Sequence, residues 1–207
     1  MTPAARARTP SAEVMGLLLD ASEAILEAEG PDALSVRRIA ADAGVAPMGV
    51  YNHFDSKAGI IDALFARSFD RLARSMASLS EIPNPLEALL VGGERYRALA
   101  LSHPAAYELM FQRSVKGFEP SPAAKEVALG SLAQLLAAVE RAIGSGALAP
   151  NDPMMVTQMI WASCHGWVAL ELNGLADFVD RDEGARQFRQ ALLAGLAHQT
   201  FGSPTES

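Results

Sequence analysis

The sequence has little cysteine, few aromatic residues and no long uninterrupted apolar run, although it is 207 residues long. Its one cysteine, Cys164, excludes an internal disulfide and is typical of a protein from a reducing cytoplasm. Because no run of about 18 uninterrupted apolar residues occurs, we expect no membrane-spanning segment and no membrane partner. The start of the chain has two arginines without an apolar segment behind them, so we interpret it as a flexible arm and not as a signal peptide.

Positive charge is also scarce. The net charge is −7, and the first sixty residues hold five Lys or Arg against eight Asp or Glu. Nucleic-acid-binding proteins usually carry a basic patch, so this balance counts against DNA binding. It does not exclude DNA binding, because net charge governs long-range steering whereas a contact needs only local charge.

The residues that are abundant favour an all-α fold. Half of the residues are apolar and only 6% are aromatic, with alanine and leucine dominant and β-branched residues sparse. The spacing of the apolar positions predicts helices over residues 12–29, 35–43, 47–54, 57–80, 85–101, 104–112, 122–143, 153–174 and 182–200. Ser35, Ser121 and Asp152 stand where N-caps belong, and Gly44 stands where a helix ends.

The stretch GVAPMGVYNHF, residues 44–54, carries the chemistry of the N-terminal region. Two short helices joined by a tight turn at a glycine form the helix-turn-helix pattern. On a helix that begins at Pro47, a rotation of about 100° per residue turns Val50 and Phe54 toward the core. The same rotation predicts that the opposite face and its flanks present Met48, Gly49, Tyr51, Asn52 and His53.

These side chains suit the major groove of DNA. Asn52 can pair with adenine through two hydrogen bonds, and Met48 can contact a thymine methyl group. Side chains that donate hydrogen bonds or carry positive charge suit the phosphates. That set comprises Tyr51, His53 and Lys57, and Arg37 on the preceding helix is placed for a phosphate or a flanking base.

The stretch LSVRRIAADAGVAPMGVYNHFDSKAGIIDALF, with the helix before it, resembles the N-terminal domain of the tetracycline repressor (TetR) family. The matching positions, at the spacing of the family, are Ser35–Val36, Ile39–Ala40, Ala43–Gly44–Val45, Val50–Tyr51, His53–Phe54 and Lys57. The resemblance implies that Tyr51, His53 and Lys57 contact phosphates, and that Arg37 and residues 47–52 read the sequence. The Ser or Thr that often starts the recognition helix is replaced here by Ala46-Pro47-Met48. We therefore expect Asn52 and the shape of the DNA to carry more of the sequence specificity.

The second half of the chain resembles the C-terminal class named for its Trp-His-Gly motif, here Trp161-x3-His165-Gly166, with HPAAYELMF upstream. The resemblance implies a small-molecule pocket and a dimer made by the last two helices. Aromatic residues, histidines and methionines form the candidate effector pocket: Tyr96, His103, Tyr107, Met110, Phe111, Phe118, Met155, Met159, Trp161 and His165. His165 is expected to be a hydrogen-bonded structural histidine. Small residues that let helices approach closely form the candidate dimer interface: Ala162, Gly166, Ala169, Ala191, Ala194 and Gly195.

The sequence therefore predicts an arm and helix-turn-helix domain over residues 1–56, a connecting helix over 57–80 and a ligand-binding and dimerisation domain over 81–207. We expect a cytoplasmic, homodimeric regulator, a repressor that binds a double-stranded DNA operator and is released by a small apolar or amphipathic effector.

Two other classes of protein have less support in the sequence. The four histidines and the cysteine lack the spacing of a metal site, and no nucleophile elbow or phosphate-binding glycine loop occurs, so we expect no catalysis, metal or cofactor. The alternative is a helical small-molecule sensor or interaction module that no longer binds DNA. The acidic charge favours this alternative, whereas the retention of Tyr51, His53 and Lys57 counts against it.

Overall fold

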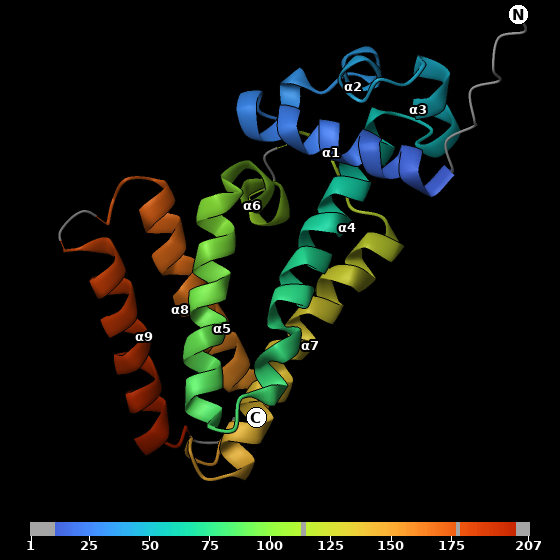
Figure 1. Cartoon of the computed structure of the whole chain (residues 1–207). Coiled ribbons are helices and arrows are strands. Elements are labelled where there is room, and N and C mark those ends of the chain that lie inside the picture. The colour runs from blue at the N-terminus through green and yellow to red at the C-terminus, as the bar shows by residue number, and fades with distance from the viewer. Residues whose placement is uncertain (1–10, 113–114, 177–178, 202–207) are drawn as a thin grey trace, which may run out of the picture. The chain divides into compact units, whose positions relative to one another are not determined.

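The computed structural model describes residues 11–112, 115–176 and 179–201, and the regular structure within these ranges is entirely helical (Figure 1). The all-α class is therefore confirmed. The α-helices are α1 (Ser11–Glu29), α2 (Val36–Asp42), α3 (Pro47–His53), α4 (Lys57–Met76), α5 (Pro85–Ser102), α6 (Pro104–Phe111), α7 (Pro122–Gly144), α8 (Pro153–Leu172) and α9 (Arg181–His198). Two short 3-10 helices are η1 (Pro31–Ala33) and η2 (Ala77–Glu81). The expected N-terminal arm lies almost wholly outside the described residues.

The predicted helix caps are confirmed. The Ser35 hydroxyl accepts the N–H of Arg38 at 3.3 Å, and the Asp152 carboxylate accepts that of Met155 at 2.7 Å. Ser121 caps α7 in the same way. Gly44 follows α2 with φ of +68°, a left-handed conformation that favours glycine and turns the chain toward α3.

The helix predicted over residues 57–80 ends earlier than expected. α4 stops at Met76, and the chain continues to residue 81 as η2. The last carbonyls of a helix lack partners within it. At the end of α4, Arg95 of α5 supplies a partner by donating to the Ser75 carbonyl at 2.8 Å, and Arg141 of α7 donates to the Leu79 carbonyl of η2 at 2.9 Å.

The chain forms two compact units, which do not follow the sequential division expected from the sequence. The first contains residues 1–68 and 105–125, and the second contains residues 69–104 and 126–207. Residues 105–125 thus group with the N-terminal helices, although the segment IPNP at 82–85, a proline-rich boundary, separates them from α4 along the chain. The division of roles at residues 57 and 81 remains a prediction.

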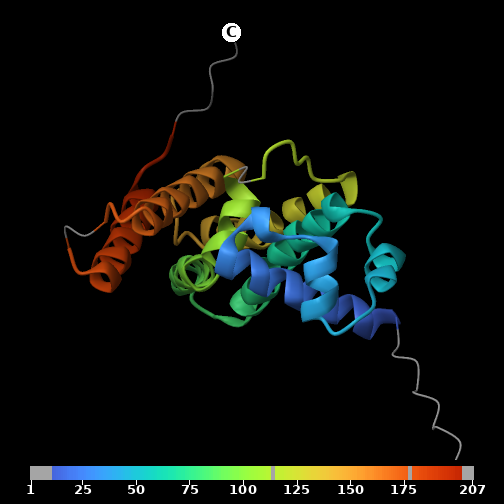
Figure 2. The same cartoon turned by 90° about the horizontal axis from the view of Figure 1, so that it is seen from above.

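In the first unit, α1, α2 and α3 pack on one another (Figures 1 and 2). Their core comprises fully or almost fully buried apolar side chains: Leu18, Ile25, Leu26, Leu34, Ile39 and Val50. The buried stripe of α1 fits a period of three to four residues, as an amphipathic helix requires. This core fixes the orientation of the short helix α3.

In the second unit, α5 packs against α8 and α9, and α8 packs against α9. Ala88 and Ala100 of α5, Val168 of α8 and Leu193 of α9 are buried. Of the described helices, α7 is long and apolar enough to cross a membrane by length and composition alone. The uninterrupted-run criterion did not single it out, and a single helix of this kind is weak evidence for a membrane role.

Candidate nucleic-acid interface and polar sites

The two faces of α3 are those that the sequence predicts. Val50 is 0% exposed and Phe54 is 6% exposed, whereas Met48 is 67% exposed and Tyr51 is 52% exposed. Asn52 is exposed as well. Of the remaining predicted DNA contacts, Pro47 and Arg37 are exposed, and Gly49, His53 and Lys57 are partly exposed.

The polar groups on this surface have hydrogen-bonding capacity to spare. Arg37, Tyr51, Asn52 and Lys57 make no hydrogen bond or ion pair with any residue in the described ranges. The ring of His53 packs beside that of Phe54, with centroids 6.3 Å apart. The surface therefore presents two cations, a phenol and an amide to solvent within three short segments of chain.

Two adjacent arginines on α2 have different surroundings. Arg38 forms two hydrogen bonds with Glu29 of α1, at 2.8 and 2.6 Å, and a third with Asp42 at 3.4 Å. The hydrogen bonds from Arg38 lower the pKa of Glu29. Arg37 makes none of these contacts, so its guanidinium is available to an outside partner.

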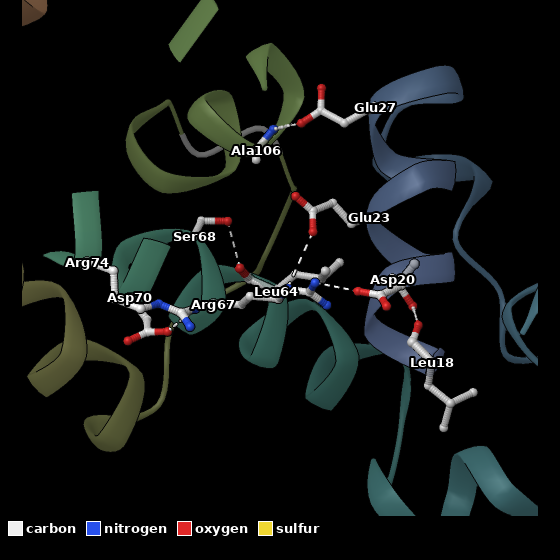
Figure 3. A network of polar contacts seen from close by, with 11 residues as sticks. Leu18, Asp20, Glu23, Glu27, Leu64, Arg67, Ser68, Asp70, Arg74 and Ala106 are labelled. Carbon is white, nitrogen blue, oxygen red and sulfur yellow. Dashed lines mark hydrogen bonds and ion pairs between the residues drawn. The ribbon is translucent and has the colours of Figure 1, made fainter. Parts of the chain in front are cut away.

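Figure 3 shows how α1 is joined to the first part of α4. The Arg67 guanidinium binds the Asp20 carboxylate and lies 3.5 Å from that of Glu23. Lys57 is the first residue of α4. The pairing of α4 with α1 therefore helps to hold Lys57 in place relative to α1 and α2, on which α3 packs.

Two other carboxylates of the first unit bind the returning segment 105–125. Glu27 of α1 accepts the N–H groups of Ala105 and Ala106 at 3.0 Å each, and thereby caps α6; Figure 3 shows the contact with Ala106. Asp62 of α4 accepts both the N–H and the hydroxyl of Ser121 at 2.7 Å. Helix caps of this kind satisfy N–H groups that have no partner in their own helix.

The candidate effector residues fall into both compact units. Tyr107, Met110, Phe111 and Phe118 lie in the first unit, and Tyr96, His103, Met155, Met159, Trp161 and His165 lie in the second. The rings of Tyr107 and Phe111 are 5.0 Å apart, and Phe118 packs on Phe65. Met155 is 49% exposed, so its side chain is not part of a packed core. Their contact with an effector remains a prediction.

His165 has the surroundings of a structural histidine. Its Nδ1 lies 3.0 Å from the hydroxyl of Tyr96, and its ring lies 6.2 Å from that of Trp161. Burial lowers the pKa of His165, so the imidazole is neutral at pH 7.

The candidate dimer residues lie largely on the surface. Ala162, Gly166, Ala191, Ala194 and Gly195 are exposed, and Ala169 is partly exposed. A Cβ atom added at either glycine would have no neighbour within 4 Å. These stripes on α8 and α9 are therefore not used for packing within the subunit.

Sequence reasoning missed a buried ion pair in the second unit. The Glu171 side chain is 1% exposed and accepts two hydrogen bonds from Arg97, each 2.6 Å long. Arg97 also pairs with Asp182 at 2.9 Å. The sequence feature that indicates this pair is the single acid, Glu171, in the otherwise apolar segment WVALEL. A carboxylate buried in such a segment needs a cationic partner.

The described ranges contain no group of three or more His, Cys, Asp or Glu residues that could hold a metal ion. Cys164 is buried, and burial raises the pKa of its thiol. The thiolate, which is the reactive form, is therefore disfavoured.

Comparisons with known proteins match both halves of the chain. Residues 18–64 match the model described as bacterial regulatory proteins, tetR family, and residues 89–195 match the tetracyclin repressor-like C-terminal domain. An uncharacterized HTH-type transcriptional regulator of Mycobacterium tuberculosis is 25% identical over 190 residues, which cover 92% of this chain and 84% of that protein. Neither description names a Trp-His-Gly class, so that finer assignment stays a prediction.

Solved structures share the fold. A protein of unknown function from Rhodococcus sp. RHA1 has a TM-score of 0.81 at 24% identity, covering 96% of this chain and all of that one. The transcriptional regulator FadR from Bacillus subtilis, in complex with stearoyl-CoA, has a TM-score of 0.70 at 20% identity, covering 87% and 98%.

Proposed function

Since this chain belongs to the tetracycline repressor (TetR) family of bacterial transcriptional regulators, we propose that it is a homodimeric repressor, released from its operator by a small apolar or amphipathic effector. Members of such a family are generally not enzymes, and a DNA-binding regulator works in the cytoplasm.

The surface of α3 carries this proposal. Tyr51 and Asn52 of α3, Arg37 of α2 and Lys57 at the start of α4 are polar groups without partners among the described residues, and Met48 of α3 is exposed. A surface of this kind would place Asn52 and Met48 against base edges, Tyr51 and Lys57 on phosphates, and Arg37 on a phosphate or a flanking base. In a two-fold dimer, the two α3 helices would enter successive major grooves of a palindromic site, roughly 34 Å apart.

We propose that α4 transmits the effector signal. α4 is continuous from Lys57 to Met76 and has residues in both compact units, so a change at one end can reorient the other. Linkage then requires that DNA weaken effector binding by the same factor by which the effector weakens DNA binding. Crystals of the DNA-bound and effector-bound forms with the same spacing between the two α3 helices would contradict this mechanism.

The effector is proposed to have an apolar body and a polar head. The candidate lining is rich in aromatic residues and methionine, which suit a deformable apolar cavity. A long-chain acyl-CoA is the first probe to use, because the Bacillus subtilis relative was solved with stearoyl-CoA. The probe should weaken operator binding by the wild-type protein in a saturable manner.

The experiment that tests the function is selection of genome fragments with the purified protein. We expect enrichment of a palindromic sequence, and loss of that enrichment with Tyr51→Ala. The net charge of −7 favours the alternative, a helical sensor that no longer binds DNA. No enrichment at low salt, in protein whose ligands have been removed by unfolding and refolding, would support that alternative and contradict the repressor.

A further inference from the structure

A recess in the second unit gathers hydrogen-bond donors that have no acceptors among the described residues. It lies between α5, α8 and α9; its enclosed part has room for about one water molecule, and the surrounding space of about 190 Å³ includes open solvent. Its lining includes Gly93, Arg97, Cys164, Trp167, Phe188 and Arg189. None of these residues belongs to the candidate effector pocket or to the candidate DNA surface.

The two arginines of the recess differ in their charge partners. Arg97 is neutralised by Glu171 and Asp182 through contacts of 2.6 to 2.9 Å. Arg189 is partly buried and makes no hydrogen bond or ion pair with any residue in the described ranges. A guanidinium carries five N–H donors and no acceptor, so all five of its donors are available.

Nearby groups do not neutralise Arg189. Burial raises the pKa of Cys164, so the adjacent thiol is uncharged at pH 7. Glu171 is occupied by Arg97, and the exposed Glu94 makes no hydrogen bond with Arg189. Both carboxylates act on the guanidinium only through space.

A second donor in the recess, on Trp167, also lacks an acceptor among the described residues. The indole Nε1–H of Trp167 is buried and has no hydrogen-bond partner within the described ranges. The Trp167 ring is fixed in place, because it stacks on Phe188 with centroids 5.0 Å apart and rings inclined by 21°. A buried donor without an acceptor is rare in folded proteins and calls for a water or an ion.

Glycine at position 93 holds the arginine in the recess. A Cβ atom at Gly93 would lie 2.6 Å from Cδ of Arg189, closer than side-chain atoms approach one another. The stem of Arg189 therefore lies directly against the backbone of α5. An alanine at this position would displace the arginine while leaving every donor in the chain.

We propose that this recess binds a small oxyanion, either the carboxylate of an organic acid or an inorganic oxyanion, between the Arg189 guanidinium and the Trp167 indole N–H. Such an anion offers only acceptors, which matches two groups that offer only donors. The planar fork of a guanidinium also fits the two oxygens of a carboxylate. The proposal of this site is independent of the proposed function, because all of its supporting observations come from residues of α5, α8 and α9.

The test follows the indole N–H resonances of the ¹⁵N-labelled full chain, with Trp167→Phe used to assign the Trp167 signal. Sodium acetate and sodium phosphate are titrated separately, with sodium chloride at the same ionic strength as the control. We expect a saturable shift of the Trp167 signal with acetate or phosphate and none with chloride. Saturation by acetate alone identifies a carboxylate site, and saturation by phosphate alone identifies an inorganic oxyanion site.

Three variants make the test specific. Arg189→Gln and Gly93→Ala should each weaken the saturable response by roughly tenfold or more, since both remove a charged donor from the anion. Gly93→Ala should also fold at least as well as the wild type, because alanine is the better helix former. Arg186→Gln, an exposed arginine paired with Glu183 on the same helix, should leave the response unchanged. No saturable shift in the wild type, or an equal shift in Gly93→Ala, would overturn the proposal and leave water as the occupant.

Discussion

At the scale of single residues, the contacts around Arg37 and Arg38 show which interactions a sequence can predict and which it cannot. Arg38 pairs with Asp42, four residues along the same helix, and local spacing alone contains such a contact. The shorter pair with Glu29 joins two helices, and no local spacing could predict it. A helical wheel placed Val50 and Phe54 in the core because only local geometry was needed.

The two arginines should respond differently to the same substitution. Arg37→Gln should reduce operator affinity and make its salt dependence shallower, because a positive charge placed for a phosphate or a flanking base is lost. Arg38→Gln should mainly lower the thermal midpoint, since its partners are Glu29 and Asp42. Fluorescence anisotropy and thermal unfolding of both variants measure the contrast. Equal losses of affinity in the two would contradict the assignment of Arg37 to DNA.

His165 should make stability depend on pH. Burial sets its folded pKa below the value of about 6.5 for an unfolded chain. As pH falls below about 6.5, the unfolded chain takes up a proton that the folded protein does not, so the free energy of unfolding decreases. His165→Gln should reduce the loss between about pH 7.5 and about pH 5.5 in urea titrations. His198→Gln, at an exposed histidine, is the control, and an identical pH profile for wild type and His165→Gln would disprove the prediction.

At the scale of helices, the N-terminal ends were predictable and one C-terminal end was not. Ser121 and Asp152 cap α7 and α8 through neighbours three residues away, so a short stretch of sequence contains the whole interaction. Arg95 of α5 binds a carbonyl at the end of α4 and Arg141 of α7 binds a carbonyl of η2, and both contacts join residues far apart in sequence. Sequence patterns do not contain such contacts.

The cap that Glu27 places on α6 should have a measurable effect. Glu27→Ala leaves the N–H groups of Ala105 and Ala106 without their acceptor and should cost about 1 kcal/mol. Urea unfolding gives the free energy, and hydrogen exchange should speed up first at these two amides. Glu108→Ala, an exposed acid on α6, serves as the control. Unchanged exchange at Ala105 and Ala106 would show that the cap is not formed in solution.

Removing one partner of the buried pair of Arg97 and Glu171 should destabilise the protein strongly, whereas replacing both partners should destabilise it much less. Arg97→Met leaves a buried carboxylate without its charge partner and should destabilise the protein by about 3–5 kcal/mol. The double variant Arg97→Met, Glu171→Met removes both charges and should recover most of that loss. Urea titrations of the single and double variants form the measurement. A double variant no more stable than Arg97→Met alone would contradict the uncompensated-charge explanation.

At the scale of the whole molecule, the grouping of residues 105–125 with the N-terminal helices could not be predicted. A proline-rich boundary at 82–85 shows where a helix starts, but not which later segment returns to the first unit. The bonds from Glu27 and Asp62 hold that segment, and both join residues far apart in sequence. The candidate effector residues, read as one set, consequently lie in two compact units.

The proposed dimer can be tested at its glycines. Gly166→Leu and Gly195→Leu place bulk where the subunit has open space, so folding should be preserved. In a dimer formed by α8 and α9 the same bulk would separate the subunits. Light scattering should therefore give a dimer for the wild type and for Gly130→Leu, an exposed position on α7 with equal space, and a monomer for the two variants. A wild-type monomer, or dimers throughout, would contradict this interface.

The most direct measurement of the central claim, that α3 and its surroundings bind operator DNA, is the salt dependence of affinity for the selected operator. Lys57→Ala should weaken binding and reduce the slope of log affinity against log salt by about 1, because one phosphate contact is lost. Lys125→Ala, an exposed lysine on α7, should change neither quantity. A slope that is the same for wild type, Lys57→Ala and Lys125→Ala would contradict the assignment of this surface to DNA.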